Sequence, residues 1–177
     1  TVDAAGVRDA LLAAQEAGLV VCTWDSDSES DARSLMVSQG TPDILGKMLV
    51  DMSVDALTKR GVDPAKDEVN YVWHYSQATV TDQNSWQVAG EAYIAENYPN
   101  WVRVADNYYS NQDAEQAVSV GAAVLDANPD LDLVICNDST ALPGQLKAAQ
   151  NKGLGKDDIT ITGFATPSSI KEYCDAD

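Results

Sequence analysis

The chain has 177 residues, of which 45% are apolar, so it can bury the core of one domain, or of one domain and part of another. Its net charge of −17 and pI near 4.1 argue against binding to nucleic acid or to anionic membrane surfaces, because both repel acidic proteins. No stretch approaches the roughly 20 apolar residues that a membrane span needs.

The N-terminal part of the sequence predicts one helix and two short strands. Residues 7–17 have a helical pattern that ends at Gly18, a usual place for glycine after a helix. The apolar run 19–24 indicates a buried strand, and the acidic segment 25–32 indicates a loop or a crossing segment. A second strand is expected at 33–37. The helix and strand before the acidic segment are too little to bury a core alone.

The rest of the sequence alternates helices and strands over short loops. A long helix is expected to begin with Thr41 as its cap and Pro42 in its first position, and to end at Gly61. The expected strands after it cover residues 69–75, 101–109, 131–136 and 159–164. The expected helices among them cover residues 82–97, 113–127 and 141–152, with a last one opened by Pro167. This order predicts an α/β fold with a parallel, doubly wound sheet and helices on both faces.

No pattern of a known catalytic or metal site stands out. The sequence has no glycine-rich phosphate loop, no G-x-S-x-G turn and no H-E-x-x-H helix. Cys22, Cys136 and Cys174 lack metal-ligand spacing, and we expect Cys22 and Cys136 to be buried thiols. His74 has no catalytic partner pattern and is expected to be a structural or a surface residue. We therefore expect no enzyme activity, no cofactor and no metal.

Two acidic groupings are weaker alternatives. Asp25 and Asp82 could form the acid–base pair of a glycosidase, but the sequence does not define their separation. Asp25, Asp27 and Asp31 could bind calcium, but this segment lacks the glycine and the closing glutamate of a calcium loop. A solvated acidic loop is the simpler interpretation.

Polar residues directly follow several of the apolar strands. They lie at residues 23–25, 78–83, 137–140 and 163–166. In open α/β sheets, ligands bind at the carboxyl ends of the strands, where these segments would converge. Their carboxylates, amides and hydroxyls predict a pocket for a neutral, hydroxyl-rich ligand. Segment 79–86 has an alternative interpretation as a helix cap, because Thr, Asp and Asn are favoured there.

Seven short segments carry a resemblance to a known family. They are VCTWDSD (21–27), QGTP (39–42), LVDM (49–52), TVTDQNSW (79–86), PDLD (129–132), ALP (141–143) and GFATP (163–167). In this order and at this spacing they resemble the autoinducer-2 and rhamnose branch of the periplasmic sugar-binding proteins of ABC importers, and most closely the Lsr-type receptors. The similarity runs through essentially all 177 residues.

The resemblance implies a type I periplasmic-binding-protein-like fold, in which two α/β lobes close over a ligand at a hinge. By this comparison, residues 1–27 are the C-terminal part of a first-lobe segment and the hinge strand. Residues 28–177 are the second lobe, truncated before the chain returns to the first. A family lysine that helps to hold the ligand from the first lobe would lie outside the sequence.

The same resemblance implies the ligand-binding residues. Asp25 would lie at the hinge strand end, and Asp82 and Gln83 would be the ligand-binding pair of the second lobe. At a further strand end the family uses mainly backbone groups of Pro and Ala, where this sequence has Asn137 and Ser139. We include both, because their side chains would face the pocket. The expected ligand is autoinducer-2 or a small sugar such as a deoxysugar or a pentose.

The expected function is therefore binding without chemistry, by a monomer that passes its ligand to the membrane permease subunits of an ABC importer. The protein would be extracytoplasmic, either periplasmic or lipid-anchored. The first residues show no signal peptide and no initial Met, so we expect the true N-terminus upstream. The alternative is the ligand-sensing domain of a sugar-responsive transcriptional regulator, whose DNA contact the acidic charge disfavours.

Overall fold

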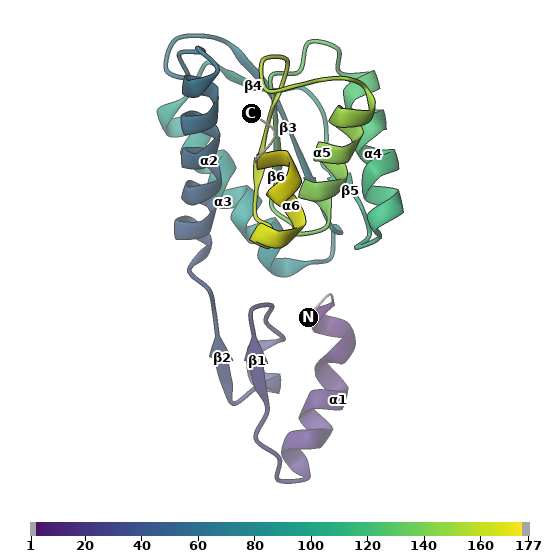
Figure 1. Cartoon of the computed structure of the whole chain (residues 1–177). Helices are drawn as coiled ribbons and strands as arrows, with labels where there is room; N and C mark the ends of the chain where they lie inside the picture. The colour runs from purple at the N-terminus through teal and green to yellow at the C-terminus, as the bar shows by residue number, and fades with distance from the viewer. Residues whose placement is uncertain (1–2, 175–177) are drawn as a thin grey trace.

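The computed structural model describes residues 3–174 as two parts of unequal size (Figure 1). A small N-terminal segment contains α1 (Ala4–Glu16), β1 (Cys22–Trp24), the short 3-10 helix η1 (Ser30–Ala32) and β2 (Leu35–Val37). The rest of the described chain forms one α/β lobe, which residues 38–41 join to the segment.

The N-terminal segment has little core of its own. β1 and β2 pair in parallel, and Arg8 of α1 forms an ion pair with Asp31 of η1. Val20 and Trp24 are 78% and 77% exposed, and no described residue of α1 is buried. Since burial of apolar surface is the main stabilising term in folding, this segment contributes little to stability by itself.

The pairing of β1 with β2 bears on the division into lobes. Because β2 lies beside β1, residues 35–37 stay with the N-terminal segment. The chain then enters the larger lobe through residues 38–41, about ten residues after the expected boundary. The assignment of residues 1–27 and 28–177 to two lobes stays a prediction.

The long helix α2 (Pro42–Lys59) begins where the sequence predicts. Thr41 Oγ1 accepts the main-chain N–H of Ile44 at 3.4 Å, and a proline occupies the first position. Gly61 follows the helix with a φ of +89°, a conformation that glycine adopts without strain. The buried apolar side chains of α2 are Leu45, Leu49, Val50 and Leu57. Together they anchor α2 to the sheet.

Five parallel strands form the sheet of the lobe. They are β3 (Val69–Tyr75), β4 (Trp101–Arg103), β5 (Tyr108–Tyr109), β6 (Leu133–Cys136) and β7 (Thr160–Gly163). Their order is β4-β3-β6-β7, and β5 pairs with the last residues of β3. Among the described strands β7 pairs with β6 alone, so its other edge is open.

The expectation of a single strand over residues 101–109 is wrong. The chain leaves the sheet after β4 and returns to it as β5. Arg103 holds the intervening turn, because its guanidinium donates to the carbonyl of Ala105 at 3.1 Å and to Oδ1 of Asn107 at 2.7 Å. These contacts stabilise the turn that separates β4 from β5.

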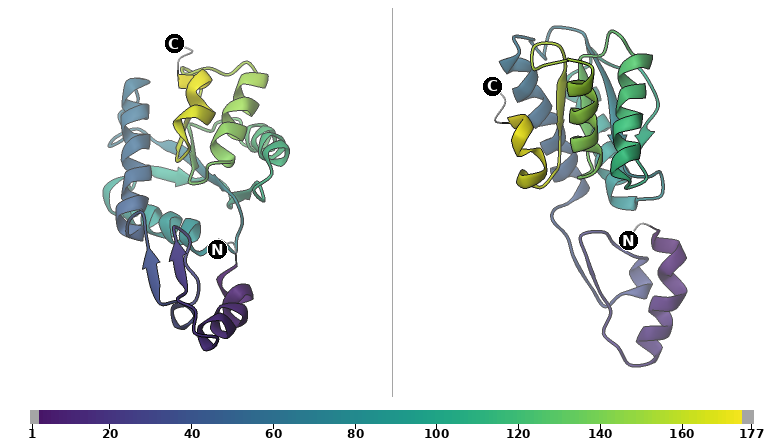
Figure 2. Two further views of the ribbon diagram at one scale, coloured as in Figure 1. Left: turned by 60° about the horizontal axis from the view of Figure 1, so that its bottom comes forward. Right: turned by 45° about the vertical axis from the view of Figure 1, so that its right-hand side comes forward.

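Helices cover both faces of the sheet (Figure 2). Helices α2 and α3 (Thr81–Asn97) pack on one face, whereas α4 (Ala114–Ala127), α5 (Ala141–Asn151) and α6 (Pro167–Cys174) lie on the other. Alternation along β3 separates the two cores: Tyr71 and Trp73 point to the α2–α3 side and Val72 to the other. These three layers confirm the predicted doubly wound fold. None of the described helices is long and apolar enough to cross a membrane.

The direction of the strands defines one functional end of the lobe. The carboxyl ends of β3 and β6 and the first turns of α3 and α5 lie at the end that faces the N-terminal segment (Figure 1). This is the end at which open α/β sheets bind ligands.

Candidate ligand-binding site

Polar side chains from several elements meet at the carboxyl ends of β3 and β6. Ser76 follows β3, Asp82 and Gln83 lie in the first turn of α3, and Asn137 and Asp138 follow β6. Hydrogen bonds to Gln83 join Ser76, Asn137 and Asp138, although β3 and β6 are far apart in the sequence. The structure therefore brings together three of the predicted residues, Asp138 from the predicted polar segment 137–140, and Ser76, which the sequence analysis missed.

Gln83 is held at both ends of its side-chain amide. Its Oε1 accepts the main-chain N–H of Ser76 at 3.0 Å, and its Nε2 donates to Oδ1 of Asp138 at 3.1 Å. The side chain thereby connects the end of β3 to the end of β6. An amide nitrogen carries two hydrogens, so one N–H remains beyond these contacts.

Asn137 is 1% exposed and reaches the first turn of α3. Its Nδ2 donates to the main-chain carbonyl of Gln83 at 2.7 Å. Its Oδ1 is buried and has no hydrogen-bond partner among the described residues. Because burying an unsatisfied acceptor is costly, this oxygen is suited to accept a hydrogen bond from a bound group.

Asp82 supplies a second buried acceptor, since its Oδ2 also lacks a partner in the described part of the chain. The helix cap is Val80, and no side chain forms a capping hydrogen bond at this end of α3. Asn84 instead donates to a main-chain carbonyl at 2.5 Å, and Ser85 donates to the carbonyl of Asp82 at 2.7 Å. The capping interpretation of this segment is therefore wrong. The helix dipole nevertheless favours a carboxylate at Asp82.

Asp25 lies in the N-terminal segment, directly after β1. Its φ of +64° falls in the left-handed region, which Asp adopts more readily than most residues. Its main-chain N–H donates to the carbonyl of Val37 at 2.9 Å, and its carboxylate accepts from the side-chain amide of Gln39. These contacts hold Asp25 beside the connection to the lobe. No described hydrogen bond joins it to Asp82.

Ser139 differs in exposure from Asp138 and Ser76, which lie outside the predicted set of ligand contacts. Ser139 is exposed, whereas Asp138 is 6% exposed and Ser76 is fully buried. Oδ2 of Asp138 accepts the main-chain N–H groups of Thr140 and Ala141 at 3.0 and 2.8 Å. An Asp just before a helix is a known capping signal that could have identified it. Ser76 joins the network through its main chain, for which the sequence has no signal.

His74 is fully buried on the α4–α5 side of β3. Its Nδ1 lies 3.1 Å from Oε1 of Gln145, so the imidazole carries its proton there and donates. Burial lowers the pKa of His74 to about 4, and the ring is therefore neutral near pH 7. These contacts agree with the structural role expected for this residue.

The cysteines confirm one expectation and contradict another. Cys136 is fully buried, and burial raises the pKa of its thiol well above the usual value. Cys22 is exposed, contrary to the expectation of a buried thiol, because β1 buries only its middle residue, Thr23. In residues 3–174, no group of three or more His, Cys, Asp or Glu side chains could hold a metal ion.

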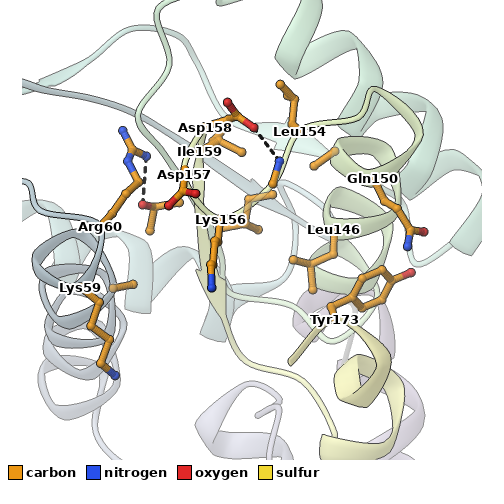
Figure 3. Close-up of a pocket in the computed structure, with 15 residues that line it drawn as sticks. Lys59, Arg60, Leu146, Gln150, Leu154, Lys156, Asp157, Asp158, Ile159 and Tyr173 are labelled. Carbon is orange, nitrogen blue, oxygen red and sulfur yellow. Dashed lines mark hydrogen bonds between the residues drawn. The ribbon is translucent and has the colours of Figure 1, made fainter. Parts of the chain in front are cut away.

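A cavity of about 740 Å³ lies at the other end of the lobe, where α2 ends and β7 begins (Figure 3). Two of its basic side chains are engaged with other groups of the protein. Arg60 donates to the carbonyl of Asp132 at 2.9 Å and to Oγ1 of Thr160 at 3.1 Å, and Lys59 pairs with Asp55 at 2.6 Å. None of the predicted ligand-binding residues lines this cavity, so it is separate from the candidate site.

Comparison with solved structures finds a relative of high sequence identity. It is described as LsrB from Clostridium saccharobutylicum in complex with AI-2 and is 66% identical to this chain, with a TM-score of 0.98. The alignment covers 99% of this chain and 54% of that chain. This chain therefore spans about half the length of the relative.

More distant structures share the fold. A solute-binding protein of an ABC transporter from Clostridium phytofermentas with bound L-rhamnose is 22% identical, with a TM-score of 0.83 over 94% of this chain and 49% of that one. A carbohydrate transporter solute-binding protein from Agrobacterium Radiobacter with D-arabinose is 18% identical, with a TM-score of 0.81 over 95% and 56%.

A family model extends this result to the whole sequence. The model described as the periplasmic binding protein domain matches residues 1–177, and it agrees with the three-layer fold. The resemblance drawn from the seven sequence segments is thereby confirmed. This chain belongs to the periplasmic binding protein domain family.

Proposed function

We propose that this chain supplies one wall of the ligand site in an extracytoplasmic solute-binding protein of an ABC importer, which binds autoinducer-2 or a small sugar. The observation that carries the proposal is the pair of buried acceptors, Asp82 Oδ2 and Asn137 Oδ1, that lack partners among the described residues. They lie at the carboxyl end of the sheet. The 66% identity to a protein solved with AI-2 supports autoinducer-2 as the first ligand to test.

The wall suits a neutral ligand that donates hydrogen bonds. Hydroxyl groups can donate both to a carboxylate such as Asp82 and to an amide oxygen such as that of Asn137. Each such bond would satisfy an acceptor whose isolation costs about 1–3 kcal/mol. An anionic ligand would instead approach the carboxylates of Asp82 and Asp138 together, which like-charge repulsion disfavours.

Asp25 and Ser139 complete the proposed set of ligand contacts with Asp82, Gln83 and Asn137. Asp25 would reach the ligand from the N-terminal segment, which faces this end of the lobe (Figure 1). Movement about residues 38–41 would bring the two parts together and exclude water from the ligand. Ser139 is exposed on the rim and would touch the ligand only in that closed state.

In this function the ligand is bound and released unchanged, so the protein needs no catalytic residue. Permease subunits in the membrane would receive the ligand from the closed protein. The binding protein would act as a monomer outside the cytoplasm, in the periplasm or on a lipid anchor. The net charge of −17 is compatible with such a role, because a strongly charged protein resists self-association.

The proposal can be tested by calorimetry on the full-length gene product with autoinducer-2, L-rhamnose and D-arabinose. We expect one of these ligands to bind, and Asp82→Asn to weaken its binding about 10- to 100-fold, since a hydrogen bond to a charged group is worth about 1.5–3 kcal/mol. The matched control is Asp106→Asn, which removes the same charge at an exposed position outside the site. Equal affinity of the Asp82 variant and the control would refute the site.

A further inference from the structure

We infer that Asp138 is a positioning residue, whose carboxylate fixes the orientation of the Gln83 amide at the ligand site. This inference rests on the proposed function for its ligand-binding part. Its structural part stands on the hydrogen bonds alone, so the two can be tested separately.

The first step is the double use of one carboxylate. Oδ2 of Asp138 accepts the N–H groups of Thr140 and Ala141 at the start of α5, and Oδ1 accepts from Nε2 of Gln83 at 3.1 Å. At 6% exposure, water competes little for these bonds. Both carboxylate oxygens of Asp138 therefore accept hydrogen bonds. An ionised carboxylate can do this, whereas a side-chain amide has only one accepting oxygen.

The second step concerns the Gln83 amide, which faces groups of opposite kind at its two ends. The Ser76 N–H can only donate, and the Asp138 carboxylate can only accept. Turning the amide over would set its nitrogen against the Ser76 donor and its oxygen against the carboxylate. Both contacts would become repulsive, so a single orientation is allowed. The N–H that Gln83 keeps for a ligand therefore lies on the same nitrogen that binds Asp138.

The third step is that asparagine cannot replace Asp138 in this network, although it caps helices as well as Asp does. If Oδ1 of the new Asn accepted from Thr140 and Ala141, its NH₂ group would face Gln83. In its present orientation, the nitrogen of the Gln83 amide would then face the NH₂ group of Asp138→Asn, which is also a donor. In the reversed orientation, the same nitrogen would face the N–H of Ser76. The cap of α5 survives, whereas the amide of Gln83 loses its fixed orientation.

The conflict has a specific remedy in a second substitution. Glu in place of Gln83 offers two acceptor oxygens, one for the Ser76 N–H and one for the new amide of Asp138→Asn. The double variant Gln83→Glu/Asp138→Asn therefore restores every hydrogen bond of the network and keeps the net charge. It also removes the N–H that Gln83 offers to a ligand. Gln83→Glu alone sets two carboxylates against each other and is destabilising.

The test is a double-mutant cycle on the full-length gene product, with melting temperature and ligand affinity measured for the wild type, both single variants and the double variant. We expect both single variants to melt below the wild type, and the double variant to melt above both. We expect Asp138→Asn to weaken binding about tenfold or more, and the double variant to stay weak although its stability is regained. A merely structural role of Asp138 would lower the melting temperature of Asp138→Asn and leave its ligand affinity unchanged, because Gln83 is intact in that variant.

The control is Asp113→Asn, since Asp113 caps α4 by accepting the Gln116 N–H at 2.8 Å and touches no site residue. Asp113→Asn should change neither the melting temperature nor the ligand affinity appreciably. The inference would be overturned if the double variant lost as much melting temperature as the two single variants lose together. It would also be overturned if Asp138→Asn bound the ligand as tightly as the wild type does. If the wild type bound no ligand of the panel, the proposed function would fail, whereas the melting temperatures would still decide whether Asp138 orients Gln83.

Discussion

The side-chain amide of Asn137 donates to the main-chain carbonyl of Gln83 at 2.7 Å, which ties the end of β6 to the first turn of α3. The contact joins two neighbouring parts of the rim through a buried residue that also presents an unpartnered oxygen. One side chain thus helps to build the wall and offers an acceptor on it. Substitutions at this position should affect stability and binding to different extents.

Asn137→Ala should weaken ligand binding more than it weakens the fold. It removes one hydrogen bond, worth about 1 kcal/mol of stability, but also removes the cost of the unpaired Oδ1, so the two effects partly cancel. The ligand loses its acceptor outright, and we expect affinity to fall about tenfold. Urea unfolding and calorimetry on the same preparation measure both. The control is Asn97→Ala, an exposed amide that donates to a helix carbonyl at 2.9 Å and should leave affinity unchanged.

His74 should make the protein less stable in acid. Its pKa is about 4 in the folded state, below the value of about 6.5 in an unfolded chain, because burial disfavours the charged ring more than the Gln145 hydrogen bond and the nearby Asp138 carboxylate favour it. Above pH 6.5 the ring is neutral in both states. As the pH falls from 6.5 toward 4, only the unfolded chain takes up the proton, and the free energy of unfolding should fall by up to about 3 kcal/mol.

The measurement for His74 is the difference in unfolding free energy between the wild type and His74→Gln at pH 7, 5.5 and 4.5. Glutamine cannot be protonated, so the variant should lose less stability in acid than the wild type does. Carboxylates titrate in both proteins and cancel from the difference. Parallel pH dependences of the two proteins would contradict a neutral, buried His74.

Gly46→Ala should disturb the site from the opposite side of α3. A Cβ at Gly46 would lie 2.6 Å from both the main-chain nitrogen of Gly90 and the carbonyl oxygen of Trp86. Helices α2 and α3 would have to separate, at a cost of about 1–3 kcal/mol that outweighs the better helix propensity of alanine. Since α3 carries the ligand-binding turn, affinity should fall as well.

Gly155→Ala is the matched control for Gly46→Ala, because the nearest atom to its Cβ would be Oδ2 of Asp158 at an ordinary 3.8 Å. Thermal unfolding and calorimetry should find this variant close to the wild type in both stability and affinity. If Gly46→Ala had the same melting temperature as Gly155→Ala, helices α2 and α3 could not lie as close together as the structure shows.

Much of the fold could be predicted because each local signal agrees with the tertiary structure. The Thr41 cap, the strand over residues 69–75 and the glycine after α2 all depend on residues close in sequence. The expectations for residues 101–109 and for Cys22 failed for another reason. Local periodicity does not reveal the turn at Arg103, nor whether other elements cover β1.

For the candidate site, the sequence could predict which residues lie together but not the hydrogen bonds between them. Strand ends in a parallel sheet converge, so Gln83 and Asn137 were expected on one rim, and they are in contact there. The partner of the Gln83 amide could not be predicted, because the choice between Asp138 and a ligand depends on distances of a few tenths of an ångström. Asp25 belongs to a separate part of the chain, and its ligand contact stays a prediction.

The open edge of β7 has a practical consequence for the chain taken alone. Over Thr160–Gly163 one side of the strand has no neighbouring strand among the described residues, and unpaired main-chain groups of this kind recruit strands from other molecules. Mutual repulsion between copies that each carry a charge of −17 opposes such recruitment at low salt. Since ions screen this repulsion beyond roughly 10 Å at 0.1 M salt, edge-to-edge aggregation should grow as ionic strength rises.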